Sequence, residues 1–262
     1  MRVLSLNVWC GKLLDPVLKF LRGADALCLQ EVLDSRFEAT AEICGVEGAR
    51  LNLFDELSAN LPEYRGIFCP SVLTYPTDPH LGYAAVHCGI ATFVRRDITL
   101  VRQFTGFVHE SYAVIPPSTP PLPRTAHSFT VWNERLGEEI GITHMHGLWT
   151  PGNPTSKQDT PERADQAKLL ARLALQAPVS RRIACGDWNV LPESKTFDIL
   201  GRIGLNDLVR GRGFTDTRTS HYEKPVRYAD YMCVTSNIKV ESFEVVKEPE
   251  VSDHRPLVLD FE

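Results

Sequence analysis

The feature that most constrains this chain is the spread of strand-like segments over its whole length. Each segment is short, rich in β-branched and aromatic residues and bounded by turn residues, as β-strands are. Helical patterns fall between them, and the clearest covers 161–177, where Thr160 suits the N-cap and Pro161 the first helical position. Interleaved strands and helices predict an α/β fold with two packed sheets flanked by helices. The predicted strands cover 3–9, 26–32, 89–94, 128–132, 139–149, 182–190, 229–235, 240–246 and 256–261, and the other predicted helices cover 16–21 and 47–61.

Length and composition predict one globular domain. The 262 residues fit a single domain spanning 1–262, and 43% hydrophobic with 23% charged residues is an ordinary globular composition. No apolar run reaches the roughly 18 residues of a membrane-spanning helix, and the first residues lack the apolar core and cleavage site of a secretory signal. We therefore expect a cytoplasmic monomer without membrane insertion. The proline-rich stretch 116–123 is interpreted as a surface loop between strands.

Charge and cysteine usage exclude further classes. Twenty-eight basic and 33 acidic residues give a net charge of −5, which excludes the broad positive surface of a non-specific nucleic-acid binder. The seven cysteines are odd in number, form no Cys-x-x-Cys pair and lie mostly in apolar runs. Such cysteines behave as small buried hydrophobic residues in a reducing compartment. We therefore expect no disulfide and no zinc site.

Polar side chains end several predicted strands abruptly, where a rigid scaffold meets solvent. Glu31 follows a run of buried-type residues, where a carboxylate is costly unless it is paired or bound to a cation. Asp187 and Asn189 stand two apart on an extended segment, so they point to the same side and can share one ligand. The polar strand ends comprise Asn7; Gln30 and Glu31; His144 and His146; Asp187 and Asn189; and Asp253 with His254, while Asp230 begins a strand.

Asp253 and His254 are adjacent, so in an extended chain they point to opposite faces and cannot form a catalytic pair with each other. His254 needs a partner elsewhere, and Asp230 is the natural candidate. The inventory of carboxylates, amides and imidazoles lacks a thiolate, and hard oxygen ligands select magnesium, manganese or calcium over zinc. A hard dication beside a histidine and an Asp-x-Asn pair suits attack of water on a phosphate ester.

Taken in order, these segments resemble the endonuclease/exonuclease/phosphatase superfamily, also called DNase I-like, from the first strand to the last. The resemblance implies a four-layer α/β/β/α sandwich of two mostly antiparallel sheets flanked by helices. It also implies hydrolysis of phosphoester bonds with a divalent cation, usually Mg²⁺, for which Mn²⁺ can substitute. Glu31, in Leu-Gln-Glu-Val, is then the principal metal ligand, Asn7 lies near the metal and the phosphate, and Asp253 approaches the metal, often through water.

The same resemblance implies how protons and phosphate are handled. Asp187 and Asn189, in Gly-Asp-Trp-Asn, match the family's Gly-Asp-Phe-Asn, where the acid orients or deprotonates the nucleophile and the amide contacts phosphate. Asp230, in Ala-Asp-Tyr, matches the acid that orients the terminal histidine. His254, in Ser-Asp-His-Arg-Pro, matches the histidine that binds or protonates the phosphate. Trp188 replaces the commoner Phe, which should change packing rather than chemistry.

The family's Thr-His-Leu strand has two candidate histidines here, His144 and His146. We prefer His146, because it stands at the strand end before the loop 150–160. In this superfamily an Arg and a Gln often follow that loop on a helix, and Arg163 and Gln166 fit that place. Contact with phosphate and local bonding to backbone are equally good interpretations of these two residues.

The expected substrate is a phosphodiester rather than a monoester, and it is compact, or a nucleic-acid end, rather than the middle of a long duplex. The best basic cluster, Arg210, Arg212 and Arg218, supplies only three charges, and aromatic and proline residues dominate the candidate pocket walls 75–83 and 112–122. The alternatives are a DNA or RNA nuclease and a catalytically silent binding module with the same fold. A silent relative should have lost a site residue, and none is missing.

Overall fold

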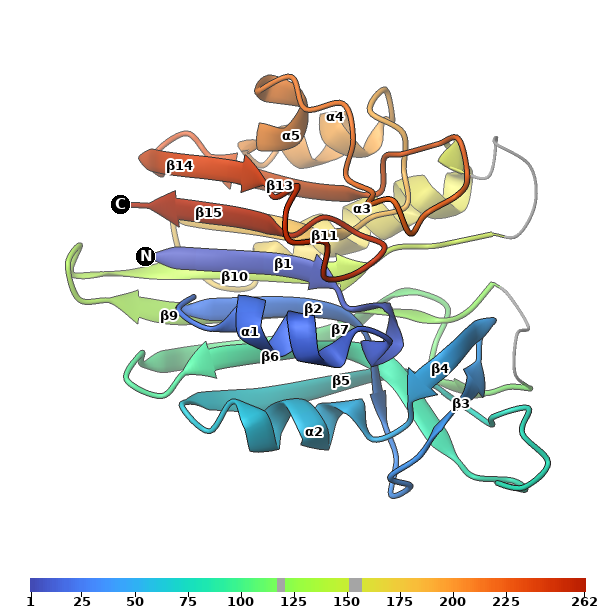
Figure 1. Cartoon of the computed structure of the whole chain (residues 1–262). Coiled ribbons are helices and arrows are strands. Elements are labelled where there is room, and N and C mark those ends of the chain that lie inside the picture. Colours follow the sequence, from blue (N-terminus) through green and yellow to red (C-terminus); the bar gives the residue numbers. More distant parts are fainter. Residues whose placement is uncertain (117–120, 151–156) are drawn as a thin grey trace.

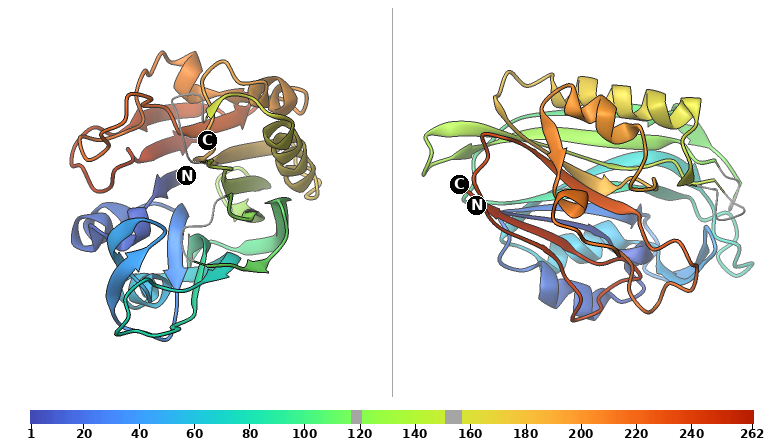
Figure 2. Two further views of the ribbon diagram at one scale, coloured as in Figure 1. Left: turned by 90° about the vertical axis from the view of Figure 1, so that its right-hand side faces the viewer. Right: turned by 90° about the horizontal axis from the view of Figure 1, so that it is seen from above.

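The computed structural model describes residues 1–116, 121–150 and 157–262, and it is a sandwich of two sheets with helices on both outer faces (Figures 1 and 2). The first sheet contains β1 (Arg2–Asn7), β2 (Ala26–Asp34), β5 (Tyr64–Thr74), β6 (Val86–Arg95), β8 (Ala113–Val114), β14 (Val240–Val245) and β15 (Leu257–Phe261). The second contains β7 (Leu100–His109), β9 (Arg124–Asn133), β10 (Glu138–His146), β11 (Arg181–Asp187), β12 (Leu205–Asp207) and β13 (Asp230–Thr235). A separate hairpin consists of β3 (Thr40–Ile43) and β4 (Val46–Arg50).

The strand order is β14-β15-β1-β2-β6-β5-β8 in the first sheet and β12-β13-β11-β10-β9-β7 in the second. Among the described strands, β1 with β2, β5 with β8 and β10 with β11 pair in parallel, and the other pairs are antiparallel. Helices α1 (Leu14–Leu21) and α2 (Leu53–Asn60) cover the first sheet, and α3 (Pro161–Ala174), α4 (Thr196–Gly201) and α5 (Leu208–Gly211) cover the second. The predicted four-layer α/β/β/α sandwich of mostly antiparallel sheets is confirmed.

Two apolar cores hold these layers together. One fills the space between the two sheets and the space under α3, and Phe129 and Trp188 are among its fully buried side chains. The other lies between the first sheet and its two helices and contains Leu21 and Phe93. Strand β2 lies between the two cores, so residues 26–30 are buried on both faces, which explains their nearly continuous apolar run.

The β3–β4 hairpin corrects the predicted helix over 47–61. Its turn places Cys44 and Gly45 at φ values of 51° and 78°, as a tight two-residue hairpin turn requires. The helix in this region begins only at Leu53. The predicted helix over 161–177 is α3, which begins where expected, with the Thr160 hydroxyl accepting a hydrogen bond near the first turn, and ends at Ala174.

The topology brings polar strand ends from both sheets to one end of the sandwich, on the right in Figure 1. Strands β1 and β2 run in parallel, with Asn7 opposite Gln30, and so do β10 and β11, with His146 opposite Asp187. Strand β13 places Asp230 opposite Asp187 from the other side. Because β1 and β2 also contact β11 across the sandwich, the polar ends of the two sheets face each other.

Two further expectations concern parts of the chain away from this end. In the described residues, no helix has both the length and the apolar character needed to cross a membrane. The proline-rich stretch 116–123 lies between β8 and β9, but its residues 117–120 lie outside the described residues.

Candidate active site

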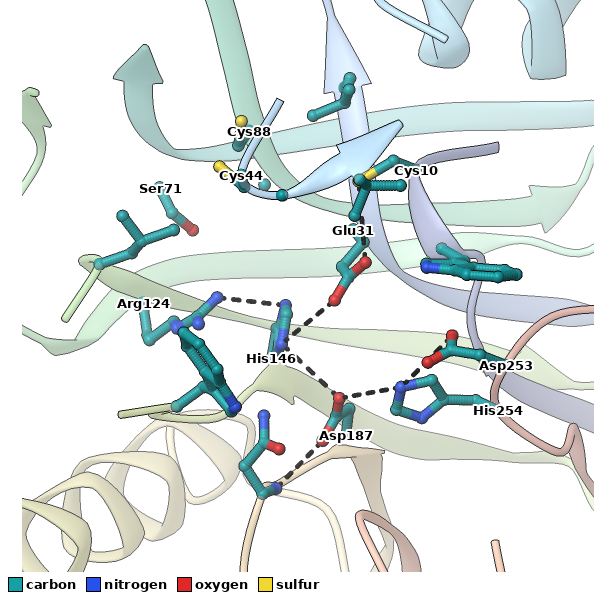
Figure 3. Close-up of a pocket in the computed structure, with 18 of the residues that line it drawn as sticks. Cys10, Glu31, Cys44, Ser71, Cys88, Arg124, His146, Asp187, Asp253 and His254 are labelled. Atoms are coloured by element: carbon teal, nitrogen blue, oxygen red, sulfur yellow. Dashed lines mark hydrogen bonds and ion pairs between the residues drawn. The ribbon is translucent and has the colours of Figure 1, made fainter. Parts of the chain in front are cut away.

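The polar ends of the two sheets surround one cavity of about 460 Å³ (Figure 3). It receives side chains from β2, from β10 and β11, and from the segments that follow β11 and precede β15. Two predicted residues stand directly behind this lining: Asn7 and Asp230 are buried and contact residues that reach the cavity. The predicted site residues that line the cavity are Glu31, His146, Asp187, Asn189, Asp253 and His254.

Glu31 reaches the cavity because β2 is interrupted at this residue. The pairing of β2 with β6 shifts between Gln30 and Val32, and Glu31 itself has a φ of 57°. A bulge of this kind redirects one side chain out of a regular ladder. Glu31 Oε1 accepts a hydrogen bond from Asn7 Nδ2 at 3.0 Å, and the Cys10 thiol lies 3.7 Å from Oε2.

The carboxylates of Glu31 and Asp253 make the cavity suitable for a hard cation. Burial, and then repulsion from Asp253, raise the pKa of Glu31 to about 7, although a quarter of its side chain reaches solvent. Two carboxylates that repel each other at a partly buried site are a typical donor set for a divalent cation. Because the donors are carboxylate oxygens, this set fits Mg²⁺ or Mn²⁺ better than a thiophilic ion.

Asn7 has a supporting position that differs from the expected contact with metal and phosphate. Its side chain is fully buried, and its amide nitrogen donates to Glu31 and, at 3.1 Å, to Asp187 Oδ2. Its amide oxygen accepts from the backbone N–H of Trp9 at 3.0 Å. With both ends of the amide engaged, Asn7 holds two carboxylates in place and offers no free atom to a ligand.

Asp187 is the central group of the site. Its Oδ2 lies 3.6 Å from His146 Nε2 and 3.6 Å from His254 Nε2. Two imidazoles, one at the end of β10 and one in the segment before β15, therefore converge on one oxygen. Its Oδ1 accepts from the backbone N–H of Asn189 at 3.1 Å. Asn189 has a φ of 52°, and its buried Oδ1 has no protein partner among the described residues. A buried amide left without a partner on the cavity wall points to a ligand.

His254 and Asp230 form the pair that the sequence suggested. Nδ1 of His254 lies 2.9 Å and 2.8 Å from the two Asp230 oxygens, and its Nε2 points toward Asp187 (Figure 3). Burial raises the pKa of Asp230 to about 7 and lowers that of His254 to about 4. Each side chain therefore needs the other to carry charge here.

A second possible donor set consists of Asp187, Asp230 and His254, whose ligand atoms all lie within 4.8 Å of one another. In that set, however, both Asp230 oxygens are already close to His254 Nδ1. A cation there would replace a buried hydrogen bond, and Asp230 does not line the cavity, whereas Glu31 and Asp253 both do. We therefore regard Glu31 and Asp253 as the better cation ligands.

His146 lines the cavity, and His144 does not. His144 is fully buried between the sheets, where its Nε2 lies 2.8 Å from the Thr92 hydroxyl. His146 Nδ1 lies 3.2 Å from a guanidinium nitrogen of Arg124. Because a guanidinium can only donate, Nδ1 must accept, which leaves the ring proton on Nε2, the atom that faces Asp187.

We expect Arg124→Met to lower kcat/KM by roughly 10- to 100-fold, the usual loss when a partner that orients a site histidine is removed. The physical reason is that His146 would no longer be held in the tautomer that carries its proton on Nε2. Nitrogen-15 NMR of the imidazoles reports this tautomer directly. Arg102→Met is the control, because Arg102 pairs with Glu139 outside the cavity. A wild-type spectrum with the His146 proton on Nδ1 would contradict the assignment.

Arg163 and Gln166 do not reach the cavity, unlike the expected phosphate contact of Arg163. The Arg163 guanidinium donates to the carbonyls of Gln158 and Leu148 at 2.8 and 3.2 Å. Gln166 Oε1 accepts from the backbone N–H of Leu148 at 2.8 Å. Both side chains thus hold the segment after β10. This agrees with the second interpretation of these residues, local bonding to backbone, rather than with contact to phosphate. Residues 151–156 of the loop 150–160 lie outside the described residues.

The three arginines of the expected basic cluster, Arg210, Arg212 and Arg218, do not lie together at the cavity. Arg210 lies over the Phe197 ring and Arg212 over the Phe243 ring, whereas Arg218 alone lines the cavity. Arg218 donates to Asp253 Oδ2 at 2.7 Å, so much of its charge is already compensated. Of the expected walls 75–83 and 112–122, only Leu122 lines the cavity among the described residues, and Tyr75, Tyr83 and Tyr112 do not. The lining residues that the sequence did not single out include Trp9, Arg124, Trp149, Tyr222 and Lys224.

Comparison with known proteins relates this geometry to one family. The family model described as "Endonuclease/Exonuclease/phosphatase family" matches residues 4–254. No curated protein matches the sequence. Similar solved structures include the endonuclease/exonuclease/phosphatase from Bacteroides vulgatus, with a TM-score of 0.70 and 19% identity, covering 100% of this chain and 98% of that one.

Two further similar structures carry more specific names. The mannosyl-6-phosphatase Bt3783 of Bacteroides thetaiotaomicron VPI-5482 has a TM-score of 0.66 and 17% identity, covering 100% of this chain and 99% of that one. The human Nocturnin catalytic domain with bound sulfate anion has a TM-score of 0.64 and 21% identity, covering 100% and 93%. At these identities the likeness is one of fold.

Proposed function

Because the chain belongs to the endonuclease/exonuclease/phosphatase family, we propose that it is a Mg²⁺-dependent phosphoesterase that hydrolyses a phosphodiester by in-line attack of water. One observation carries the proposal: two imidazole Nε2 atoms lie 3.6 Å from a single oxygen of Asp187, beside the carboxylates of Glu31 and Asp253. Metal-assisted hydrolysis needs a cation site, a group that orients water and a group that handles a proton within one small volume.

Glu31 and Asp253 would hold the cation, Mg²⁺ or Mn²⁺, and Asn7 would keep Glu31 in position. The bound cation would neutralise charge on the phosphate and polarise its oxygens. Arg218 orients Asp253 through their 2.7 Å ion pair. These assignments agree with the carboxylate oxygens of Glu31 and Asp253, while the nearby Cys10 thiol is kept neutral because burial raises its pKa.

Asp187 would orient the attacking water, since its oxygen is the one on which both imidazoles converge. His254, held by Asp230, would handle the proton or bind the phosphate, in the manner of an imidazole oriented by a buried acid. His146 would donate its Nε2 proton as a hydrogen bond to a phosphate oxygen, and Asn189 would contact the phosphate through its amide. Preorganised donors of this kind stabilise the charge of the transition state.

The charge of the cavity favours a diester over a monoester. Its cationic side chains are Arg124, Arg218 and Lys224, and the first two stand close to the site carboxylates. A phosphodiester carries one negative charge, whereas a monoester carries close to two near neutral pH, so the monoester meets more repulsion from these carboxylates. The similar structures named as a phosphatase and as a domain with bound sulfate support phosphoester chemistry on this fold.

The test is a panel assay of the purified protein with bis(4-nitrophenyl) phosphate, 4-nitrophenyl phosphate and long duplex DNA. We expect diester hydrolysis that depends on Mg²⁺ or Mn²⁺, exceeds monoester hydrolysis and is abolished by EDTA. Asp187→Asn is the control for contaminating activity and should be inactive. Preferred cleavage inside long duplex DNA, with binding that weakens steeply as salt rises, would instead indicate a nuclease. Full turnover in EDTA would contradict the cation assignment.

A further inference from the structure

The cavity continues beyond the proposed phosphate site into a half with a different character. In Figure 3, Cys44, Cys88 and Ser71 lie on the opposite side of Glu31 from His254. This half, here called the apolar half, is lined by Leu33, Cys44, Val46, Val72, Cys88 and Leu122 together with Ser71. Leu33 and Val72 are only 1% exposed, so they form its floor.

The few polar side-chain atoms in the apolar half are already bonded within the protein. The Ser71 hydroxyl lies 2.6 Å from the Thr125 hydroxyl and also accepts from the backbone N–H of Thr125 at 3.2 Å. A hydrogen bond with Cys44, and then burial, raise the pKa of the Cys88 thiol well above its usual value, so this thiol stays neutral. None of the described residues of this half offers a charged side chain.

The two halves of the cavity also differ in how many of their buried polar atoms lack a protein partner. Buried polar atoms without a protein partner occur on Arg124, Asn189 and Arg218, which surround the proposed phosphate site. None occurs on the described side chains of the apolar half. A sugar placed there would leave its hydroxyls without partners, at a cost of about 1–3 kcal/mol for each buried group. An alkyl or aryl group would lose nothing and would gain burial.

We propose that the apolar half is a subsite for an alkyl or aryl group of a compact phosphodiester. The proposal rests on the phosphoesterase function proposed above and names the chemistry of its substrate. The phosphate would lie among Glu31, Asp187 and His254, and one ester substituent would extend past Glu31 between Val72 and Cys88. The same arrangement disfavours a nucleoside as that substituent, because its sugar would lie among side chains that cannot bond to it.

Binding of phosphonates tests the subsite without requiring turnover. Methyl-, butyl- and phenylphosphonate, each used as its monomethyl ester, share one singly charged head group and differ only in the apolar substituent. Each buried methylene improves affinity by roughly fourfold, so butylphosphonate should bind about 10- to 60-fold more tightly than methylphosphonate in isothermal titration with Mg²⁺ present. The butyl and phenyl compounds distinguish an aliphatic from an aromatic substituent.

Matched substitutions locate the gain in affinity. Val72→Thr and Val46→Thr each add a hydroxyl to the apolar half at nearly constant volume. Val101→Thr makes the same change on the surface, where Val101 is 38% exposed, and serves as the control. Both cavity variants should reduce the ratio of butyl to methyl affinity several-fold and leave methylphosphonate binding unchanged. Val46 is only half-buried, so its variant keeps the test available if Val72→Thr folds poorly.

The outcomes separate this inference from the proposed function. Equal affinity for all three phosphonates, or a ratio unaltered in both cavity variants, overturns the subsite while leaving the phosphoesterase intact. Failure of every phosphonate to bind, together with no hydrolysis of any phosphoester, overturns the proposed function and the subsite with it. A ratio that falls in the cavity variants but not in Val101→Thr supports the subsite.

Discussion

Glu31→Gln is expected to reduce kcat/KM at limiting Mg²⁺ by about 100-fold or more. The amide keeps the size of the side chain and one oxygen that can accept from Asn7, but it removes the charge that attracts the cation. Stabilisation of transition-state charge by a metal is worth several kcal/mol, and each loss of about 1.4 kcal/mol is a tenfold loss in rate. Turnover measured across a magnesium titration should show a large rise in the Mg²⁺ concentration required. Unchanged activity in limiting magnesium would refute the assignment.

The same variant has an opposite expected effect on stability when chelator is present. The folded-state pKa of Glu31 is about 7, above its ordinary value of 4.5. A group whose pKa rises on folding contributes stability that is present below its unfolded pKa and is lost as pH rises through its folded pKa. In EDTA, Glu31→Gln should therefore gain stability relative to wild type between about pH 4.5 and pH 7, with a plateau above.

Urea unfolding in EDTA at pH 5 and pH 8 measures this difference, because glutamine does not titrate. Addition of Mg²⁺ at pH 8 should stabilise the wild-type protein and have little effect on the variant. Equal stabilisation of both proteins by Mg²⁺ would mean that the cation binds elsewhere. The pH comparison is informative even if the variant has no activity.

His254→Ala is expected to lower turnover by about 100- to 10,000-fold, the range for loss of a general acid or base. Asp230→Asn should cause a loss of similar order, since the amide can no longer accept the Nδ1 proton through either of two oxygens. Both proteins should remain folded in circular dichroism, because burial favours the neutral form of whichever partner is left. Single-turnover rates measure the chemical step directly.

The double variant distinguishes a coupled pair from two separate contributions. If Asp230 acts only through His254, the double loss should be close to that of His254→Ala alone, as for residues that act as one unit. A double loss equal to the product of the two single losses would show that the residues act independently. Ser242→Ala is the control, because Ser242 lies on the edge strand β14, bonds to Asp260 and does not line the cavity.

The sequence predicted the parts of the site that follow from strand ends and spacing. Asp187 and Asn189 alternate along the chain and do meet the same cavity, and Asp230 is the partner of His254. These relations depend on short segments whose side-chain directions follow from an extended backbone. The preference for His146 over His144 had the same basis, since only the strand end reaches the cavity.

The sequence could not predict features that depend on register between distant strands. Arg124 lies beside His146 because β9 pairs with β10 so that Ala126 faces Met145. No local pattern marks this arginine, which follows a proline-rich stretch. Arg163 shows the converse. The resemblance to the family implied that Arg163 contacts the phosphate, but its guanidinium donates to two backbone carbonyls.

Several elements were missed for local physical reasons. Strand β5 contains Gly66 and Pro70, which weaken a strand pattern, and β7 is an edge strand whose side chains are alternately exposed. The β3–β4 hairpin depends on a positive φ at Cys44, and a cysteine in the sequence does not predict that conformation. Patterning therefore identified the layers of the sandwich better than its edges.

The left-handed backbone at Glu31 and Asn189 has a consequence for protein engineering. Both residues hold φ values near 55° that favour glycine, and strain of this kind costs about 1–3 kcal/mol at each position. Laboratory evolution for heat resistance alone would therefore reward glycine at these two positions while discarding the side chains that reach the cavity. A thermostable library of this protein has to be screened for turnover in every round, because gains in melting temperature at these two positions coincide with the loss of its chemistry.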